Sequence, residues 1–532
     1  MRPANVSPLA TAPPPAAIYN QRVYTLAWVA SMGAFIFGYD LAFIGTTITL
    51  KPFIRDFGLE HASASRLNAF SANIVSSLQA GCFFGALSAA PLGDKIGRKP
   101  TLILTGIIFC IGSLMQTASM GNAGVLIAGR VIGGLGVGAA TMVIPVYIAE
   151  ASPPLIRGRL VGLYEIIAQA GTCIGFWINY GVNLHVAPTS TQWRIPFAIQ
   201  LIPGILLIVG MFFLPESPRW IARCRDQESA CKVLATLRNL PSDHEYVVDE
   251  IHAIKHQVEQ ERLAINGEGL LSKLRELILP GNRWRITLGV MLFVFQQMTG
   301  SNAINYYSPR IFKSIGLVGQ NTVLLSTGVY GIVRFIAVCI SMWWLVDRIG
   351  RTKLLMSGGA VAAFAMWFLG VFVKLSPPKT GSNAAAAHVS PAGEAAAAMI
   401  YIYAAAFCFS WAGIPFIYAS EIFPLRIRSV GVAICIATHW LMNFVIARSV
   451  PYMISNIGFG TYFVFAACIT LSIPFIYFLV PETKAFALEE MDKLFGTIVD
   501  SDAYTSQEAL DHAESRTVPQ IVLTIKDRDL DV

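Results

Sequence analysis

Twelve long apolar segments constrain most tightly how this chain can fold. A run of roughly 20 apolar residues crosses a bilayer as a helix, and such runs occur six times before a charged stretch and six times after it. The first six are expected at Tyr24–Leu50, Ala69–Leu92, Thr101–Ser119, Ala123–Ile148, Leu160–Asn183 and Trp193–Leu214. The second six are expected at Trp284–Phe312, Thr322–Val346, Leu354–Val373, Ala398–Ser420, Ser429–Ile454 and Gly460–Val480. The sequence predicts an all-α membrane protein of twelve transmembrane helices in two pseudo-symmetric halves.

Composition and charge placement favour the same class. The chain is 55% hydrophobic and only 13% charged, which is too apolar for a soluble protein of this length. The predicted units are a tail (1–20), a first half (21–214), a polar linker with short helices (215–283), a second half (284–483) and a tail (484–532). Cations concentrate in the short loops on the linker's side of the spans, so both termini are expected in the cytoplasm. We expect a plasma-membrane protein without a cleavable signal peptide.

Several function classes are not indicated. The nine cysteines lie mostly in apolar segments and lack metal-ligand spacing, so neither a metal site nor a disulfide framework is predicted. The net charge of +7 resides in short loops rather than on a soluble domain, so nucleic-acid binding is not expected. The glycine run at Gly133–Gly138 lacks the strand-then-helix context of a dinucleotide site. We expect no enzyme activity, no cofactor and a monomer.

Three motifs occur once in each half, in the same order. The repeats pair Gly93–Lys99 with Asp347–Lys353, Tyr147–Arg157 with Tyr418–Arg428, and Pro215–Arg219 with Pro481–Lys484. Three matched pairs imply a duplicated six-span unit. Alternating-access transporters build a central site between such repeats.

Polar side chains interrupt the seventh apolar segment. Gln296, Gln297, Thr299, Asn302 and Asn305 lie where hydropathy predicts a membrane helix. Unpaired buried amides are unfavourable by a few kcal/mol each. These side chains therefore either line a wet cavity and bind a ligand, or bond to neighbouring helices.

Together the repeated motifs and the Gln-Gln-x-x-Gly-x-Asn core resemble the sugar porter family of the major facilitator superfamily, over about Tyr24 to Gly496. The segments Arg157–Glu165, Phe176–Gly181 and Ile304–Pro309 are most similar to fungal quinate-permease and sugar-acid members. The resemblance implies proton symport of a monosaccharide or a polyhydroxy acid such as quinate or galacturonate. A facilitative hexose uniporter and a non-transporting sugar sensor are the alternatives, although the tail after Pro481 is short for a sensor.

The resemblance also implies roles for individual residues. Gln296, Gln297 and Asn302, with Asn305 beside them, would hydrogen-bond substrate hydroxyls, because amides both donate and accept. The residues that would complete the pocket and close its outer gate are Trp411, Asn443, Tyr306 and Tyr307. His439, one turn from Asn443, either contacts substrate or is a structural histidine.

Two groups of charged residues carry further expectations. Asp40 and Arg130 lie within predicted spans, where a charge is unfavourable by roughly 2.5–3.5 kcal/mol; they either couple proton binding to transport or form a permanent structural bridge. The repeated loops place acidic and basic residues at the inner ends of the spans. We expect these to form an inner latch that consists of Asp94, Arg98, Glu150 and Arg157 in the first half and Asp347, Arg351, Glu421 and Arg428 in the second.

This chain departs from the sugar porter pattern at the predicted pocket. Glu165 stands where relatives usually have Gln, with Gln169 one turn later, and Arg334 stands at or beside a position that is often Asn in neutral-sugar porters. Arg334 would either bind a substrate carboxylate bidentately or pair with Glu165. These departures favour an acidic substrate over a neutral sugar.

Overall fold

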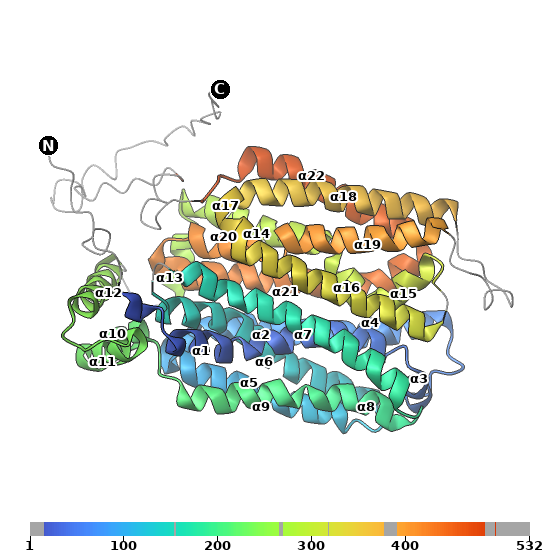
Figure 1. Cartoon of the computed structure of the whole chain (residues 1–532), viewed down its shortest axis with the longest axis horizontal. Coiled ribbons are helices and arrows are strands. Elements are labelled where there is room, and N and C mark those ends of the chain that lie inside the picture. Colours follow the sequence, from blue (N-terminus) through green and yellow to red (C-terminus); the bar gives the residue numbers. More distant parts are fainter. Residues whose placement is uncertain are drawn as a thin grey trace.

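The computed structural model of the chain describes residues 15–153, 156–264, 270–317, 319–376, 391–484 and 495. It is a bundle of long helices that run side by side (Figure 1). The first half contains α1 (Gln21–Ala30), α2 (Met32–Thr47), α3 (Lys51–Asp56), α4 (Ala64–Ile96), α5 (Arg98–Thr117), α6 (Ala123–Ala151), α7 (Arg157–His185), α8 (Ser190–Ile199) and α9 (Leu201–Phe213). The linker contains α10 (Pro218–Cys224), α11 (Gln227–Arg238), α12 (Glu245–Ala264) and α13 (Leu270–Leu277).

The second half follows with helices of similar length. It contains α14 (Asn282–Met298), α15 (Ser301–Ser314), α16 (Gln320–Ile340), a π-helical turn (Ser341–Leu345), α17 (Val346–Ile349), α18 (Arg351–Leu375), α19 (Pro391–Ser410), α20 (Ile414–Ile422), α21 (Leu425–Asn456) and α22 (Gly460–Leu479). The predicted tails at 1–20 and 484–532 lie largely outside the described residues.

Eleven helical segments among the described residues are long and apolar enough to span a membrane. The predicted seventh span is not one of them because it is divided into α14, of 17 residues, and α15, of 14 residues. The two pieces follow each other across Thr299 and Gly300, so together they occupy the place of the seventh span. The all-α membrane fold predicted from the sequence is confirmed.

Besides the single-residue interruptions at Ser31 and Gln200, two spans of the second half are broken more widely. Between α14 and α15, Gly300 adopts a left-handed conformation (φ 84°), and a side chain there would collide with the ring of Phe465. Glycine is the residue that tolerates both conditions. The second break, at Trp411–Gly413, separates α19 from α20. Interrupted helices occur at membrane depth where protein or a cavity surrounds the freed backbone.

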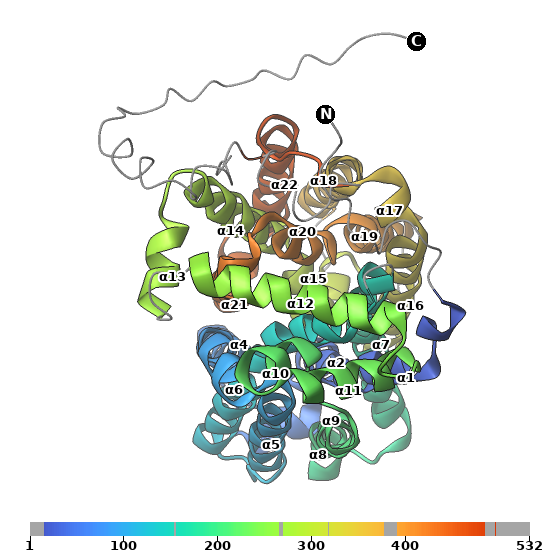
Figure 2. The same cartoon turned by 90° about the vertical axis from the view of Figure 1, so that its left-hand side faces the viewer.

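The two halves meet along three pairs of helices. α4 packs along α21, α7 along α16, and α2 against α15. Helices α10–α12 project from one end of the bundle, which we call the linker end; the opposite end is the far end (Figure 1). Viewed from the linker end, α12 crosses in front of the boundary between the halves (Figure 2).

The linker is a small helical unit with its own apolar core. Trp220, Leu234 and Ile251, from α10, α11 and α12, pack together. Arg238 forms a buried bidentate ion pair with Glu250, with N–O distances of 2.8 and 2.6 Å, and donates to the carbonyl of Ala151 at 2.8 Å. These contacts fix the unit to the end of α6. The last linker helix, α13, packs instead against α14 and α21 of the second half.

Candidate functional site

The two helix breaks exchange hydrogen bonds. The side-chain amide of Gln296, on α14, donates to the carbonyls of Trp411 (2.8 Å) and Ala412 (3.1 Å), which the second break leaves without helical partners. In return the hydroxyl of Tyr403, on α19, donates to the carbonyl of Thr299 at 2.8 Å. Each interruption is therefore satisfied by a side chain of the other helix, which joins the breaks to each other.

A continuous series of polar side chains runs away from these breaks. We call it the polar chain; its members, in order, are Arg334, Tyr330, Asn305, Asn302, Gln297, His439 and Gln296. The successive donor–acceptor distances along the chain are 3.1, 3.1, 3.3, 2.8, 3.4 and 3.0 Å, with His439 accepting from Gln297 at Nε2 and donating to Gln296 from Nδ1. All the predicted amides of the seventh span thus belong to one network in the second half.

His439 is held by rings as well as by amides. Its ring lies against Phe293 and Phe416, with centroids 5.7 and 5.4 Å away, and Trp440 lies 5.2 Å away. Its Nδ1 is within hydrogen-bonding distance of Gln296 and Gln297. The imidazole therefore links the two glutamines of the polar chain. This position is compatible both with substrate contact and with a structural role for His439.

Arg334 reaches from the second half to the first. Its Nε donates to Gln169 on α7 at 3.0 Å, and its Nη1 donates to Ser301 at 2.8 Å. Gln169 in turn donates to Glu165 at 2.8 Å. Arg334 and Glu165 do not form a direct ion pair, because Gln169 lies between them, so the alternative of direct pairing between these two residues is not what the structure contains.

Asp40 and Arg130 form a closed pair inside the first half. The two terminal nitrogens of Arg130, Nη1 and Nη2, donate to the carboxylate of Asp40 at 3.2 and 3.1 Å. Asp40 is 1% exposed and Arg130 is 0% exposed. Gln116 lies 3.5 Å from the same guanidinium. A bidentate pair of this kind compensates two charges that the membrane interior disfavours.

A cavity of about 960 Å³ opens beneath the polar chain at the linker end. Its inner wall includes Glu165, Phe293, Phe416 and Gly413, and its outer wall includes residues of α10, α12 and α13. Phe293 and Phe416 both pack on His439, so these two rings separate the cavity from the polar chain. The breaks and the polar chain therefore lie in the second half, next to the inner wall of the cavity and divided from it by these two rings.

At the far end, the space between the two halves is closed. The hydroxyl of Tyr306 donates to Asn443 at 3.1 Å and lies 2.6 Å from the amide of Gln79 on α4. The hydroxyl of Tyr307 donates to the carbonyl of Ala447 at 2.7 Å. Both predicted gate tyrosines are fully buried on α15, which is kinked at Tyr307. The structure is therefore open toward the linker and closed at the far end.

The predicted latch residues form two equivalent clusters. In the first half Arg98 contacts Glu150 at 3.0 Å, and Ser217 donates to the same carboxylate at 2.5 Å. In the second half Arg351 contacts Glu421 at 2.9 Å, and Thr483 donates to that carboxylate at 2.6 Å. Each of these pairs lies within one half, and the two face the cavity from opposite sides.

The other predicted latch residues lie around these pairs. Asp94 contacts Arg98 at 3.2 Å and also Lys273 of α13 at 3.5 Å. Arg157 and Arg428 line the cavity, and Arg428 donates to the carbonyl of Phe423. The side chain of Asp347 lies outside the described residues.

A second carboxylate caps a helix in each half. Glu216 accepts from the amides of Arg98 and Lys99, and Glu482 accepts from those of Arg351 and Thr352. The preceding residues, Gly97 and Gly350, share the same positive φ, near 102° and 105°, and a Cβ at either would strike the capping carboxylate. In each half, the capping glutamate of the Pro-Glu motif therefore requires the glycine of the loop motif beside it.

The pKa values of the two capping carboxylates are shifted in opposite directions. Burial raises the pKa of Glu216 and outweighs the amides that lower it. Burial also acts on Glu482, but there the amides of Arg351, Thr352 and Lys484 and the Thr352 hydroxyl prevail, and the pKa lies below its ordinary value. Equivalent positions in the repeat thus hold their charge with different strength.

Several residues of the site were not identified in the sequence. Tyr330 connects Arg334 to the amides, Ser301 accepts a hydrogen bond from Arg334, and Tyr403 completes the exchange between the breaks. Tyr330 lies one turn before Arg334 on α16, a spacing that could have indicated it. Of the remaining predicted pocket residues, Trp411 contributes its carbonyl and Asn443 bonds to Tyr306.

Two broken helices that meet beside a central cavity, in a bundle of two six-span halves, define the major facilitator class of membrane transporter. Solved structures agree: the proton:xylose symporter XylE bound to 6-bromo-6-deoxy-D-glucose has a TM-score of 0.75 and 28% identity, covering 89% of this chain and 99% of that one. The inward-open conformation of the xylose transporter XylE from E. coli has a TM-score of 0.69 and 27% identity, with the same coverage of 89% and 99%.

The sequence comparisons narrow the class to one family. Residues 26–495 match the family described as "Sugar (and other) transporter", and the chain belongs to that family. The quinate permease of Neurospora africana is 44% identical over 486 residues, which cover 91% of this chain and 90% of the relative. A probable quinate permease of Aspergillus niger is 45% identical over 488 residues, with the same coverage.

Proposed function

We propose that this protein imports a polyhydroxylated small molecule by proton symport, using alternating access. The observation that carries the proposal is the polar chain, a row of side chains that donate and accept hydrogen bonds, set between a closed gate and an open cavity. A hydroxyl group both donates and accepts hydrogen bonds, so the hydroxyl groups of a sugar or polyol can take the place of a neighbouring side chain at each bond of the polar chain. In this proposal the linker end faces the cytoplasm and the membrane is the plasma membrane, as the loop charges predict.

A polyhydroxy acid is the substrate class that we favour. Arg334 is buried, and its hydrogen-bond partners Gln169, Ser301 and Tyr330 are all neutral. A buried arginine beside neutral acceptors suits a carboxylate, which it can bind through two parallel hydrogen bonds. The relatives named quinate permeases support this choice.

Proton coupling rests on Asp40. Addition of one proton to this carboxylate removes its charge and ends the bidentate attraction to Arg130, which frees the α2–α6 contact to rearrange. The solved relative named a proton:xylose symporter supports this assignment. The two arginine–glutamate clusters would then approach each other when the linker end closes, as the predicted inner latch.

The test is uptake by cells that lack their own sugar and acid transporters. Labelled quinate, galacturonate, glucose and xylose are supplied at two pH values, with and without an uncoupler. We expect acid-stimulated accumulation of quinate or galacturonate above the external concentration, abolished by the uncoupler. Uptake that only equilibrates and ignores the uncoupler would indicate a facilitator, and no uptake by a chain present at the surface would indicate a sensor.

A further inference from the structure

The far end is held closed by two arginines that bond to neutral side chains. Arg310, on α15, donates to Asn68 at 2.9 Å and to Ser71 at 3.2 Å, and Arg448, on α21, donates to Asn73. All three acceptors belong to α4, in the other half. Neither arginine forms an ion pair with a carboxylate among the described residues, in contrast to Arg98 and Arg351 at the linker end.

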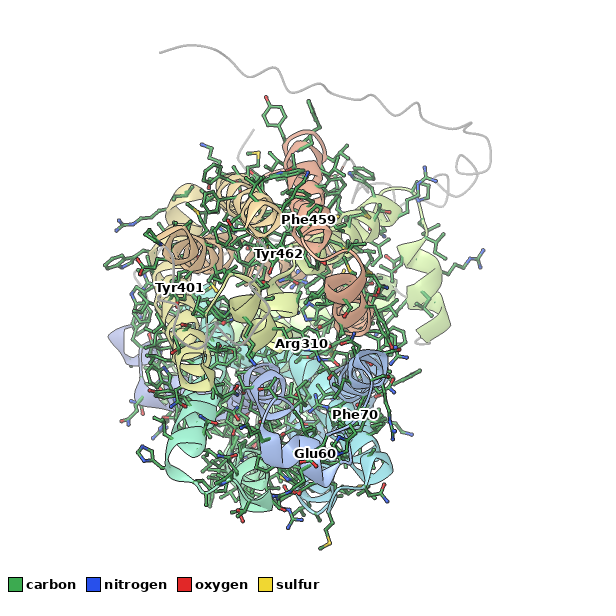
Figure 3. All side chains as sticks on the ribbon, turned by 90° about the vertical axis from the view of Figure 1, so that its right-hand side faces the viewer. Glu60, Phe70, Arg310, Tyr401, Phe459 and Tyr462 are labelled. Atoms are coloured by element: carbon green, nitrogen blue, oxygen red, sulfur yellow. The ribbon has the colours of Figure 1, made fainter. Side chains whose placement is uncertain are left out.

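The two arginines face different sides of α4. Asn68 and Ser71, three residues apart, share one face of the helix and are 8% and 6% exposed. Asn73 lies on the opposite side of α4 and is exposed. Arg310 is therefore directed into the boundary between the halves, and Figure 3, which labels it, shows it near the middle of the far end.

Arg310 also lies on the closed gate itself. Its guanidinium carbon is 5.8 Å from the ring centroid of Tyr307, the side chain whose hydroxyl bonds to α21. Arg310 follows Pro309 on the kinked helix α15. When the halves separate at the far end, α15 leaves α4, and Arg310 loses both neutral acceptors at the entrance of the path that leads to the polar chain.

We infer that Arg310 selects anionic substrates at this entrance: in the far-end-open state its guanidinium binds the substrate carboxylate in place of Asn68 and Ser71. This inference rests on the proposed transport of a polyhydroxy acid. A neutral acceptor is exchanged easily for a charged one, because a hydrogen bond from a guanidinium to a carboxylate is roughly twice as strong as one between neutral groups. An acidic partner on α4 would instead have neutralised the arginine.

The experiment compares galacturonate with galactose, which differ by a carboxylate in place of a hydroxymethyl group. KM for each is measured in wild type, Arg310→Gln and Arg448→Gln, with surface amounts quantified. We expect Arg310→Gln to raise KM for galacturonate about three- to tenfold and to leave KM for galactose within about twofold. Arg448→Gln is the matched control: it removes the same charge and a bond to the same helix, and it should leave the ratio of the two constants unchanged.

A second variant keeps the arginine. Asn68→Asp gives Arg310 a charged partner, and we expect it to raise KM for galacturonate alone, by competition with the substrate carboxylate. Equal effects of Arg310→Gln on both sugars, or equal effects of Arg310→Gln and Arg448→Gln on galacturonate, would overturn the inference. Failure of the proposed acid transport would look different, because wild type itself would then take up neither galacturonate nor quinate.

Discussion

Gln296 donates a hydrogen bond across 2.8 Å to the main-chain carbonyl of Trp411, and this contact joins the break in one transmembrane helix to the break in another. We expect Gln296→Leu, which keeps the volume and removes the amide, to leave the carbonyls of Trp411 and Ala412 unpaired. Each unpaired buried carbonyl is unfavourable by about 1–3 kcal/mol. Thermal unfolding in detergent should show a lower Tm, and the uptake assay a loss of transport.

Tyr403→Phe is the control for that variant. It removes the reciprocal bond to the carbonyl of Thr299 but leaves the amide of Gln296 in place. It should lower Tm to a similar extent and keep more of the substrate affinity. If Gln296→Leu were as stable as wild type, the exchange of bonds between the breaks would not be an important stabilising contact.

Asp40→Asn should separate accumulation from exchange. The amide keeps the shape of the carboxylate but cannot carry the charge that Arg130 compensates, so no proton is taken up at this site. We expect accumulation against a gradient to be abolished while exchange of labelled for unlabelled substrate across proteoliposome membranes persists. Accumulation at the wild-type level in this variant would exclude Asp40 as the coupling residue.

Arg334→Gln tests the acidic substrate at the central site. The glutamine can still bond to Ser301 or Tyr330, but it lacks the charge and the paired donors that a carboxylate requires. KM for an anionic substrate should rise by about tenfold or more, and KM for a hexose far less. Ser301→Ala, which keeps the arginine and removes one of its acceptors, is the control; a hexose affected as strongly as the acid would contradict the assignment.

The two capping glutamates should respond differently to substitution and pH. The pKa of Glu482 is lowered in the folded protein, so its charge stabilises the fold above the ordinary value of 4.5, and this contribution is lost as pH falls through the lowered pKa. The pKa of Glu216 is raised by burial, so its charge does not stabilise the fold in this way. At neutral pH, Glu482→Gln should lower Tm by about 1–2 °C and Glu216→Gln by less.

Acidification provides the check on that prediction. As the pH falls below the pKa of Glu482, the melting curves of wild type and Glu482→Gln should converge. A constant difference between them at all pH values would mean that the carboxylate acts through shape alone.

The fold could be predicted from the sequence because bilayer thickness fixes the length of each apolar segment. The repeated motifs were equally informative: Gly97 lies beside Glu216, and Gly350 lies beside Glu482, because each capping carboxylate excludes a Cβ at the neighbouring position. The position of the break before Ser301 was not predicted, because the polar residues around Gly300 were interpreted as substrate ligands or as contacts to neighbouring helices, and a glycine is also compatible with an unbroken helix.

Contacts between helices were harder to predict than the helices themselves. The polar residues of the seventh span were identified, yet Tyr330 and Tyr403 were not, because their role depends on how α16 and α19 are rotated in the bundle. Arg334 was predicted either to bind a substrate carboxylate or to pair with Glu165. The interposed Gln169 depends on a spacing between the halves that no local pattern encodes.

The polar chain also bears on how broadly this protein accepts its substrates. Its amides already bond to one another, so a group that a ligand leaves without a partner can return to its neighbour instead of staying unpaired. The loss of one substrate hydroxyl should then be tolerated, in contrast to sites whose isolated polar groups reject analogues that lack a hydroxyl. Discrimination among sugars, polyols and their deoxy analogues would be weak along the polar chain. Arg334 at its end and Arg310 at the entrance would separate acids from neutral molecules.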